Sequence, residues 1–557
     1  MLKKILDYFG LRSEISKSER FQNIKSNFLL IFSALAFYIL SAPGKSKSYV
    51  LGLFMAFIAL LMTGSQFKSL LKRTAKESRF LRIFSIISTF GVAENAAERF
   101  VDIWSKARLL RRFFGEKLTL LLIVICFFGA LCSLPFLYTA FCLCFYALKK
   151  RFDSIKHDLC AMPKSELCFY AFMLIAAFVY MTVIYSQSYA FYDPETELRD
   201  LIYTSDTRLI ARPNAYLSIA NGENDLRQPL FAVFSAPFIA VPYALSIPCR
   251  LFAPYASFYF MNYAQIALLE LSIILLALLI SENPIERIAF SLVLTVSFPY
   301  LLFSLVMEQY VIATFYLILF IYSACKKQND AIFLFGAIGT LTTSTILTPL
   351  MIKFSTIKEI KQWIKRLFAL GFAFVFIMVL FCRGDTLVRI FTEIKAYAGF
   401  TGKSIAFEER CMQYFSFVSA CFFAPISEIR HYFYVTEAEN LSWQLAPVTS
   451  WSISGISIFA LCTVSVAINR KNHLCKVSVV WILFSFLLLC ILGWGTKENG
   501  LVLYTLYFSW AFVFLLFLLF PKKLRIIACI TFCAALLKYN ISALKDLFSF
   551  ASEICSR

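Results

Sequence analysis

LCFYAFMLIAAFVYMTVIY, residues 167–185, is a run of apolar side chains without a single charge. A helix needs about 20 such residues to cross the roughly 30 Å hydrocarbon core of a bilayer. Similar runs recur along the 557-residue chain, and 60% of all residues are hydrophobic, against about 45–50% in soluble domains. Because backbone polar groups in lipid must be paired within each segment, we predict helices; the alternating ~10-residue segments of a β-barrel are missing.

The predicted fold class is an all-α polytopic membrane protein with roughly 10–13 transmembrane helices, whose outer-face loops carry short amphipathic helices. One segment between 229 and 324 is expected to be half-length or re-entrant, because the flanking charges do not alternate. Residues 330–350, with Gly336, Gly339 and Pro349, predict a broken or re-entrant pair of helices. The other spans are expected at 27–42, 49–66, 118–148 (a hairpin broken near Pro135), 229–248, 255–280, 288–306, 310–324, 367–382, 446–468, 477–494, 501–520 and 525–543.

The net charge of +20 is carried by basic loops between the apolar runs. Cytoplasmic loops of membrane proteins are enriched in Lys and Arg, so the charge predicts orientation and argues against a nucleic-acid partner. Residues 67–117, 149–166, 353–366, 469–473 and 521–525 are expected inside, whereas 186–228, 383–445 and 495–500 are expected outside. The polar, basic N-terminus is interpreted as a retained cytoplasmic tail, which places the chain in the cell (inner) membrane as a multi-pass protein.

Three regions are expected along the chain: a basic N-terminal membrane region at 1–166, a catalytic membrane core at 167–400, and a second outer loop with the C-terminal helices at 401–557. The 17 cysteines lie mostly within apolar runs and are interpreted as small buried hydrophobic residues. The three histidines are scattered, so no metal site is predicted.

Three polar clusters are predicted to meet at the outer face. The first is the acidic loop 186–228, the second is Glu308 between two apolar runs, and the third is the turn 495–500 with Lys497 and Glu498. Ionisable groups at membrane depth are costly unless they are paired or hydrated, so they are candidates for function. The alternative for Glu308 is a structural ion pair that locks the bundle.

Four short motifs, three in or beside these clusters and one in segment 330–350, resemble the GT-C superfamily of integral membrane glycosyltransferases, such as protein O-mannosyltransferases and aminoarabinose transferases. They are Ser205-Asp206-Thr207-Arg208 in the first outer loop, Arg227-Gln228-Pro229-Leu230 at the entry to the next span, Glu308-Gln309-Tyr310, and Gly336-Ala337-Ile338-Gly339. The family often has His-Pro at the second element, where this chain has Gln228. The resemblance covers most of residues 167–510 and leaves the N-terminal region unexplained.

The resemblance implies inverting sugar transfer from a polyprenyl-phosphate donor on the extracytoplasmic side, with Asp206 as general base. Removing the acceptor proton requires such a carboxylate, and arginine forks bind the leaving phosphate well. The phosphate ligands are then Arg208, Arg212, Arg227 and Lys497, and Glu308 and Glu498 are cavity acids. Asp193 is the alternative base, although Asp193-Pro194 also fits a helix cap.

Other interpretations stay open. A glycan polymerase, a transporter or flippase for a lipid-linked glycan, and a non-catalytic scaffold share the multi-span pattern; a transporter should show a second broken segment matching 330–350. The sequence leaves the cofactor unknown, since the acids at 193–206 offer the oxygen ligands of a divalent cation without a diagnostic spacing. The acceptor is a glycan, lipid or protein. Trp443 and Trp451 could stack on sugar, or anchor the chain at the membrane interface.

Overall fold

The computed structural model describes residues 155–187, 231–253, 256–326, 405–431, 441–494 and 500–555, with short pieces at 115–117, 152–153, 202–203, 228, 336–337, 340, 364 and 401. The chain divides into two compact units. The first (Met1–Ala161, Tyr216–Val233 and Glu359–Glu393) is described mainly by a helical piece at 155–160. The second (Met162–Ala215, Phe234–Lys358 and Ile394–Arg557) is described below by itself, and draws on both the predicted 167–400 and 401–557 regions.

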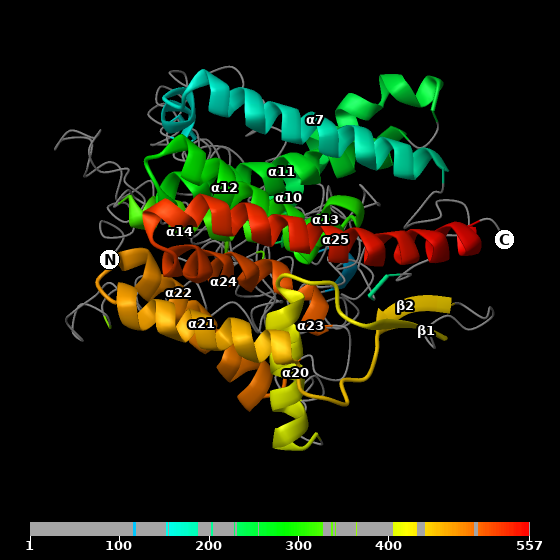
Figure 1. The fold of residues 1–557 in the computed structure, drawn as a ribbon. Coiled ribbons are helices and arrows are strands. Elements are labelled where there is room, and N and C mark those ends of the chain that lie inside the picture. The colour runs from blue at the N-terminus through cyan, green and yellow to red at the C-terminus, as the bar shows by residue number, and fades with distance from the viewer. Residues whose placement is uncertain are drawn as a thin grey trace. The chain divides into compact units, whose positions relative to one another are not determined.

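The second unit is an α-helical bundle with one small β-hairpin (Figure 1). Its first half comprises α7 (Lys164–Gln187), α10 (Phe231–Ser246), the 3₁₀ turn η2 (Pro248–Leu251), α11 (Ala256–Ile280), α12 (Pro284–Val296), α13 (Phe298–Leu305) and α14 (Gln309–Cys325). Its second half comprises α20 (Phe407–Ala420), β1 (Ser427–His431), β2 (Leu441–Leu445), α21 (Ile453–Asn469), α22 (His473–Ser485), the π-helix η4 (Phe486–Ile491), α23 (Gly500–Leu503), α24 (Thr505–Leu519) and α25 (Lys522–Cys555). Figure 1 shows α20 lying across the direction of the other helices.

Four of the described helices are long and apolar enough to cross a membrane: α7, α11, α22 with η4, and α25. The pair α12–α13 makes a fifth if it counts as one bent span. The described part is therefore a mainly α-helical, multi-pass membrane protein, as the apolar runs predict, and the β1–β2 hairpin is the exception to the expected all-α fold. The spans predicted before residue 164 and at 330–350 and 367–382 lie largely outside the described residues. The predicted total of roughly 10–13 transmembrane helices therefore stays a prediction.

Burial separates helices that face lipid from helices that face protein. The side chains of α14 and α24 are almost all buried. In contrast, α7 exposes a stripe at helical spacing, with Phe172 66%, Ile175 60% and Val179 57% exposed. Soluble monomers rarely expose a continuous apolar stripe of this kind to water. The stripe is therefore expected to face the hydrocarbon of the membrane. Leu524, Ile527 and Ile530 form a similar exposed stripe on α25.

Some predicted boundaries need correction. The expected span 288–306 is two helices bent by 64°, because the chain turns at Ser297 and the second helix begins at Phe298 with Pro299 in its first turn. The last helix continues past the expected end at 543 to Cys555, since Leu544, Leu547 and Phe550 carry its buried face onward. The 16 residues of α10 make about 24 Å of helix. This is shorter than the bilayer core, in line with the half-length segment expected between 229 and 324.

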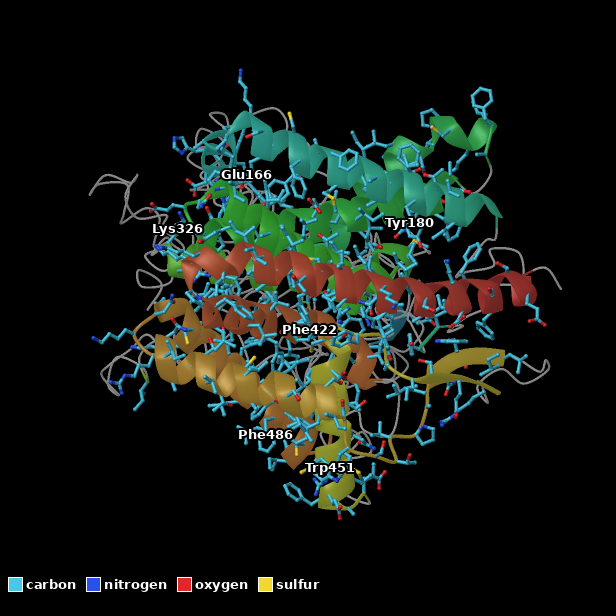
Figure 2. The ribbon with its side chains drawn as sticks, in the orientation of Figure 1. Glu166, Tyr180, Lys326, Phe422, Trp451 and Phe486 are labelled. Atoms are coloured by element: carbon cyan, nitrogen blue, oxygen red, sulfur yellow. The ribbon has the colours of Figure 1, made fainter. Side chains whose placement is uncertain are left out.

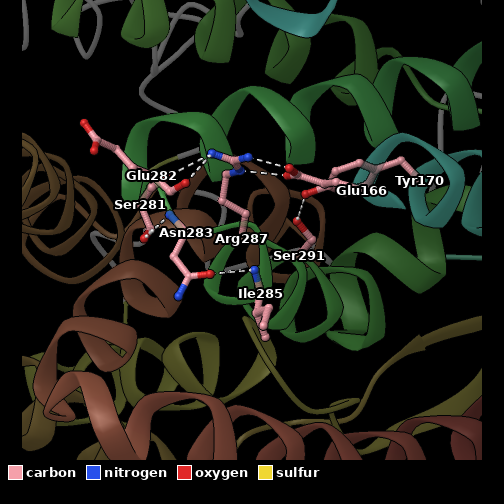
Figure 3. A network of polar contacts seen from close by, with 8 residues as sticks. All are labelled: Glu166, Tyr170, Ser281, Glu282, Asn283, Ile285, Arg287 and Ser291. Atoms are coloured by element: carbon pink, nitrogen blue, oxygen red, sulfur yellow. Dashed lines mark hydrogen bonds and ion pairs between the residues drawn. The ribbon is translucent and has the colours of Figure 1, made fainter. Parts of the chain in front are cut away.

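A polar network joins α7 to α12 (Figure 3). Arg287 donates to both carboxylate oxygens of Glu166, with Nε to Oε1 at 2.7 Å, and donates to the carbonyls of Ser281 and Glu282 at 3.3 and 3.1 Å. One turn along, the hydroxyls of Tyr170 and Ser291 lie 2.9 Å apart. The network therefore ties two helices and supplies donors to the carbonyls of the turn between α11 and α12.

Arg525, at the start of α25, extends this network. It forms an ion pair with Glu286 at 3.1 Å, and Ser281 donates to the same carboxylate at 2.7 Å. We call this end of the bundle, with Glu166, Glu286, Arg287 and Arg525, the ion-pair end. Lys326 lies toward this end too, whereas Tyr180 of α7 lies away from it (Figure 2).

The side chain of Asn540 in α25 is buried and forms hydrogen bonds to two other segments of the bundle. Its amide nitrogen donates to the carbonyls of Val296 and Phe422, both at 2.8 Å, and its oxygen accepts from the backbone N–H of Ala424 at 2.9 Å. Phe298 N–H also donates to the Phe422 carbonyl, at 3.0 Å. The break between α12 and α13 is thereby fixed to the segment that follows α20.

Close packing of α20 on α21 depends on Gly455. A Cβ placed there would lie 1.8 Å from the backbone carbonyl oxygen of Phe415, which is too rigid a neighbour to move aside. We expect Gly455→Ala to separate the two helices and lower the free energy of unfolding by about 1–3 kcal/mol.

Thermal unfolding of purified protein, followed with a thiol-reactive fluorogenic dye, measures this effect because Cys421, Cys462 and Cys475 are buried until the bundle opens. The matched control is Ser457→Ala, on an exposed position of the same helix, which should change nothing measurable. Equal midpoints for both variants would contradict the close-packing argument.

Candidate functional site

Two segments predicted to lie outside the membrane meet in the structure. Ile202 and Trp443 form a parallel bridge, and Tyr203 N–H donates to the Trp443 carbonyl at 2.8 Å. Trp443 belongs to β2, which pairs antiparallel with β1 from Ser427↔Leu445 to His431↔Leu441. The hairpin was not expected from the sequence, and it joins loop 186–228 to loop 383–445.

Tyr203 is the centre of this junction. Its hydroxyl lies 2.7 Å from Ser427 Oγ and accepts from the indole N–H of Trp443 at 3.3 Å. Burial raises the pKa of the Tyr203 hydroxyl to about 12, so it is neutral over the physiological range and keeps its proton for a hydrogen bond. Its φ of 51° is unusual for a residue with a side chain, and the surrounding contacts hold it there.

The same junction is tied to the bundle. The Tyr203 ring packs edge-on against Phe298 at the start of α13, with 6.4 Å between centroids. The Trp443 ring packs on Phe550 of α25 at 5.5 Å. The Trp443 indole thus uses its N–H and its ring in contacts within the protein, and the choice between sugar stacking and membrane anchoring stays a prediction. We call this end of the bundle, with Tyr203 and the β1–β2 hairpin, the hairpin end.

Glu308 is the one predicted site residue that the structure describes, and it is completely buried. It lies between α13 and α14 in extended conformation, where α14 begins. The side-chain amide of Gln265 on α11 pairs with the Glu308 backbone, donating to its carbonyl at 3.3 Å and accepting from its N–H at 3.2 Å. This reciprocal pairing holds the acid at a set position. Gln265 was not singled out in the sequence, where it is one polar residue within an apolar run.

A cluster of tyrosine rings lies near the acid. The Tyr310 ring lies 6.0 Å from Tyr504 and 5.3 Å from Tyr507, and Glu308 is within electrostatic range of the Tyr507 hydroxyl. Trp494 donates its indole N–H to the Tyr504 hydroxyl at 3.0 Å. A buried carboxylate and several hydroxyls are groups that can bind hydroxyl-rich ligands through hydrogen bonds.

The third predicted cluster begins beside these tyrosines. Trp494 and Gly500 flank the turn with Lys497 and Glu498, and Trp494 also bridges to Thr401 of the second loop. Asp193, Asp206, Arg208, Arg212, Arg227, Lys497 and Glu498 lie outside the described residues, so their roles stay predictions. Among the residues that the structure does describe, no group of three His, Cys, Asp or Glu side chains could hold a metal ion.

The backbone of Gly336, in the predicted re-entrant segment, contacts Tyr316 of α14 closely. A Cβ there would meet the Tyr316 ring at 2.3 Å, and Thr340 donates to the Gly336 carbonyl at 2.7 Å, as in a helical turn. The rest of segment 330–350 lies outside the described residues, apart from Ala337.

Comparison of the sequence with protein-family models and with curated proteins, and of the fold with solved structures, gives no match.

Proposed function

We propose that the protein is a GT-C-like membrane glycosyltransferase that transfers a sugar from a polyprenyl-phosphate carrier to an acceptor at the extracytoplasmic membrane interface. The carrier's tail belongs in hydrocarbon while its phosphosugar belongs in water, so such an enzyme needs a reaction site at one end of a helix bundle. The site in this proposal is the hairpin end.

The observation that carries the proposal is the convergence of separate polar segments there. The bridge between Ile202 and Trp443 and the bridge between Thr401 and Trp494 join three predicted outer segments. Two residues after Glu308, the Tyr310 ring packs on Tyr504, whose hydroxyl accepts from the Trp494 indole N–H. Asp206 follows Tyr203 by three residues, which reach at most about 11 Å when extended, so we expect it at this end.

In this proposal Asp206 removes the acceptor proton as the hydroxyl attacks the anomeric carbon, with Asp193 as the alternative base. The leaving polyprenyl phosphate is bound by Arg208, Arg212, Arg227 and Lys497, and the configuration of the anomeric carbon is inverted. Glu308 and Glu498 accept hydrogen bonds from sugar hydroxyls, and the Glu308 backbone is already held by Gln265.

The test is transfer in reconstituted vesicles. Purified protein is supplied with polyprenyl-phosphate hexoses, one at a time, together with a membrane extract as the source of acceptor. We expect consumption of at least one lipid-linked sugar with release of polyprenyl phosphate. If one of these lipid-linked sugars crosses the bilayer and none is consumed, the flippase interpretation replaces this one.

The proposal also requires the hairpin end to face outward. We expect Ile426→Cys, at a position 80% exposed beside β1, to react with a membrane-impermeant maleimide in intact cells. Lys471→Cys, exposed between α21 and α22, should react only after lysis. Each is measured against the parent chain to subtract native thiols such as Cys160 and Cys168. The reverse pattern would invert the topology and move the site to the cytoplasmic side.

A further inference from the structure

Glu270 lies deep within the membrane-spanning part of α11. Ten residues separate it from Ile280, the nearer end of the helix, which is about 15 Å of helix rise. The hydrocarbon core is roughly 30 Å thick, so the carboxyl is close to the middle of the bilayer. Its neighbours along the chain are Leu268, Leu269, Leu271 and Ser272.

The side of α11 that carries Glu270 faces α7. Tyr263, Ala267, Glu270 and Ile274 follow one another at helical spacing and share intermediate exposure, between fully buried positions. At the top of this stripe Tyr263 contacts α7 directly: its hydroxyl lies 2.5 Å from Thr182 Oγ1, and its ring lies 4.8 Å from Phe178. Toward the ion-pair end, Glu166 and Tyr170 of α7 are tied to α12. Glu270 therefore lies in the α7–α11 seam between two sets of polar ties.

Among the described residues, Glu270 has neither a hydrogen-bond partner nor an ion-pair partner. The Tyr170 hydroxyl of α7 lies within electrostatic range of Glu270, and the charged groups Glu166, Glu286 and Arg287 of α7 and α12 are held in the ion-pair network. Neither α13 nor α14 contains an Asp, Glu, Lys, Arg or His, and Arg250 in η2 stacks on the Tyr243 ring at 4.0 Å. Of the described cations toward the ion-pair end, Arg287 and Arg525 are paired with Glu166 and Glu286, and Lys326, just past the end of α14, lies over the Tyr322 ring at 5.8 Å. None of these three forms an ion pair with Glu270.

An ionised carboxylate without a counter-charge is very costly in hydrocarbon, and such a group takes up a proton instead. We propose that Glu270 is a proton-binding site within the membrane, neutral in the resting protein, whose ionisation requires water or a cation to enter the α7–α11 seam. The seam suits such opening, because only 17% of the most apolar window of α7 is buried in the protein. This site is separate from the hairpin end and goes beyond sugar transfer.

The experiment uses dicyclohexylcarbodiimide, a membrane-soluble reagent that needs a protonated carboxyl. The carboxyl proton moves to a carbodiimide nitrogen while the carboxyl oxygen bonds to the central carbon. The adduct then rearranges to a stable N-acylurea without losing any atom. Purified full-length protein in lipid vesicles is treated with the reagent, and the modified peptide is found by mass spectrometry.

We expect the adduct on Glu270, with a yield that falls as the pH is raised from about 6 to about 9, because burial moves the ionisation of a carboxyl into this range. Glu270→Gln should abolish it, whereas the ion-paired Glu166 and Glu286 should stay unmodified. Exposed carboxyls such as Glu408 should react only with a water-soluble carbodiimide. Failure to modify Glu270, or a yield that is the same at every pH, would overturn the proposal.

Thermal unfolding gives an independent readout. A neutral Glu270 predicts that Glu270→Gln keeps or raises the midpoint, because the amide replaces an uncharged group of the same shape. Glu286→Gln is the matched control and should lower the midpoint, since it breaks the 3.1 Å pair with Arg525. A lower midpoint for Glu270→Gln would mean that the carboxylate is charged and partnered, contrary to the proposal. Neither measurement depends on sugar transfer.

Discussion

Arg287→Met is expected to lower the free energy of unfolding by about 3–5 kcal/mol. The Glu166 side chain is fully buried and receives both of its hydrogen bonds from Arg287. Methionine fills much of the same volume, but it leaves the carboxylate buried without a counter-charge. It also leaves the carbonyls of Ser281 and Glu282 without their donor. The midpoint of thermal unfolding in detergent, read by thiol exposure, measures the change.

Two controls separate this effect from a general sensitivity of the bundle. The double variant Glu166→Gln/Arg287→Met removes both charges, so it should be much more stable than the sum of the two single variants predicts. Arg430→Met breaks the exposed pair with Glu428, whose side chains are 40% and 42% exposed, and should cost about 1 kcal/mol or less. Additive single and double variants would show that the two charges do not depend on each other.

The long apolar runs predict the helices well because a span leaves a local signal. The expected spans at 167–185, 255–280 and 310–324 correspond to α7, α11 and α14 within a few residues at each end. The bend at Ser297–Phe298 also had a local sign in Pro299, whose ring cannot continue a helical hydrogen-bond ladder.

Contacts between distant residues could not be predicted in this way. Glu166 and Arg287 are 121 residues apart and read in the sequence only as loop charges. The β1–β2 hairpin has five-residue strands, SEIRH and LSWQL, that are too short and mixed for a periodic signal. The extension of α25 had a signal, since Leu544, Leu547 and Phe550 repeat at helical spacing, but the helix there is no longer membrane-like in composition.

In the candidate site, too, features with a local sequence signal could be predicted and contacts between distant residues could not. That Glu308 is buried beside other polar residues follows from its place between two apolar runs, because lipid exposure would be costly. That Gln265 holds its backbone, and that Tyr203 joins the first loop to Trp443, depends on the pairing of helices and strands. The chemical roles assigned to residues of loop 186–228 are based on the composition of the loop and on the GT-C resemblance. Mutagenesis tests these roles directly.

Asp206→Asn is expected to lower the rate of sugar transfer by about 10²–10⁴-fold, the usual effect of losing a general base. Asparagine keeps the size and most hydrogen bonds of the side chain, but it cannot take the proton from the acceptor hydroxyl. The Tyr203 junction, three residues earlier, should hold the loop in place in both proteins, with the Tyr203 N–H bonded to the Trp443 carbonyl. The unfolding midpoint should therefore stay the same while the rate falls.

Asp193→Asn is the matched control, since it removes a carboxylate from the same loop and should leave most of the transfer rate intact. Arg227→Lys should weaken use of the donor without abolishing transfer, because lysine keeps the charge but loses the two-pronged contact with phosphate. Full activity of Asp206→Asn together with loss of activity in Asp193→Asn would assign the base to Asp193. Full activity in both variants would mean that neither carboxylate takes the acceptor proton, and Glu308, already buried at the same end of the bundle, would be the next candidate.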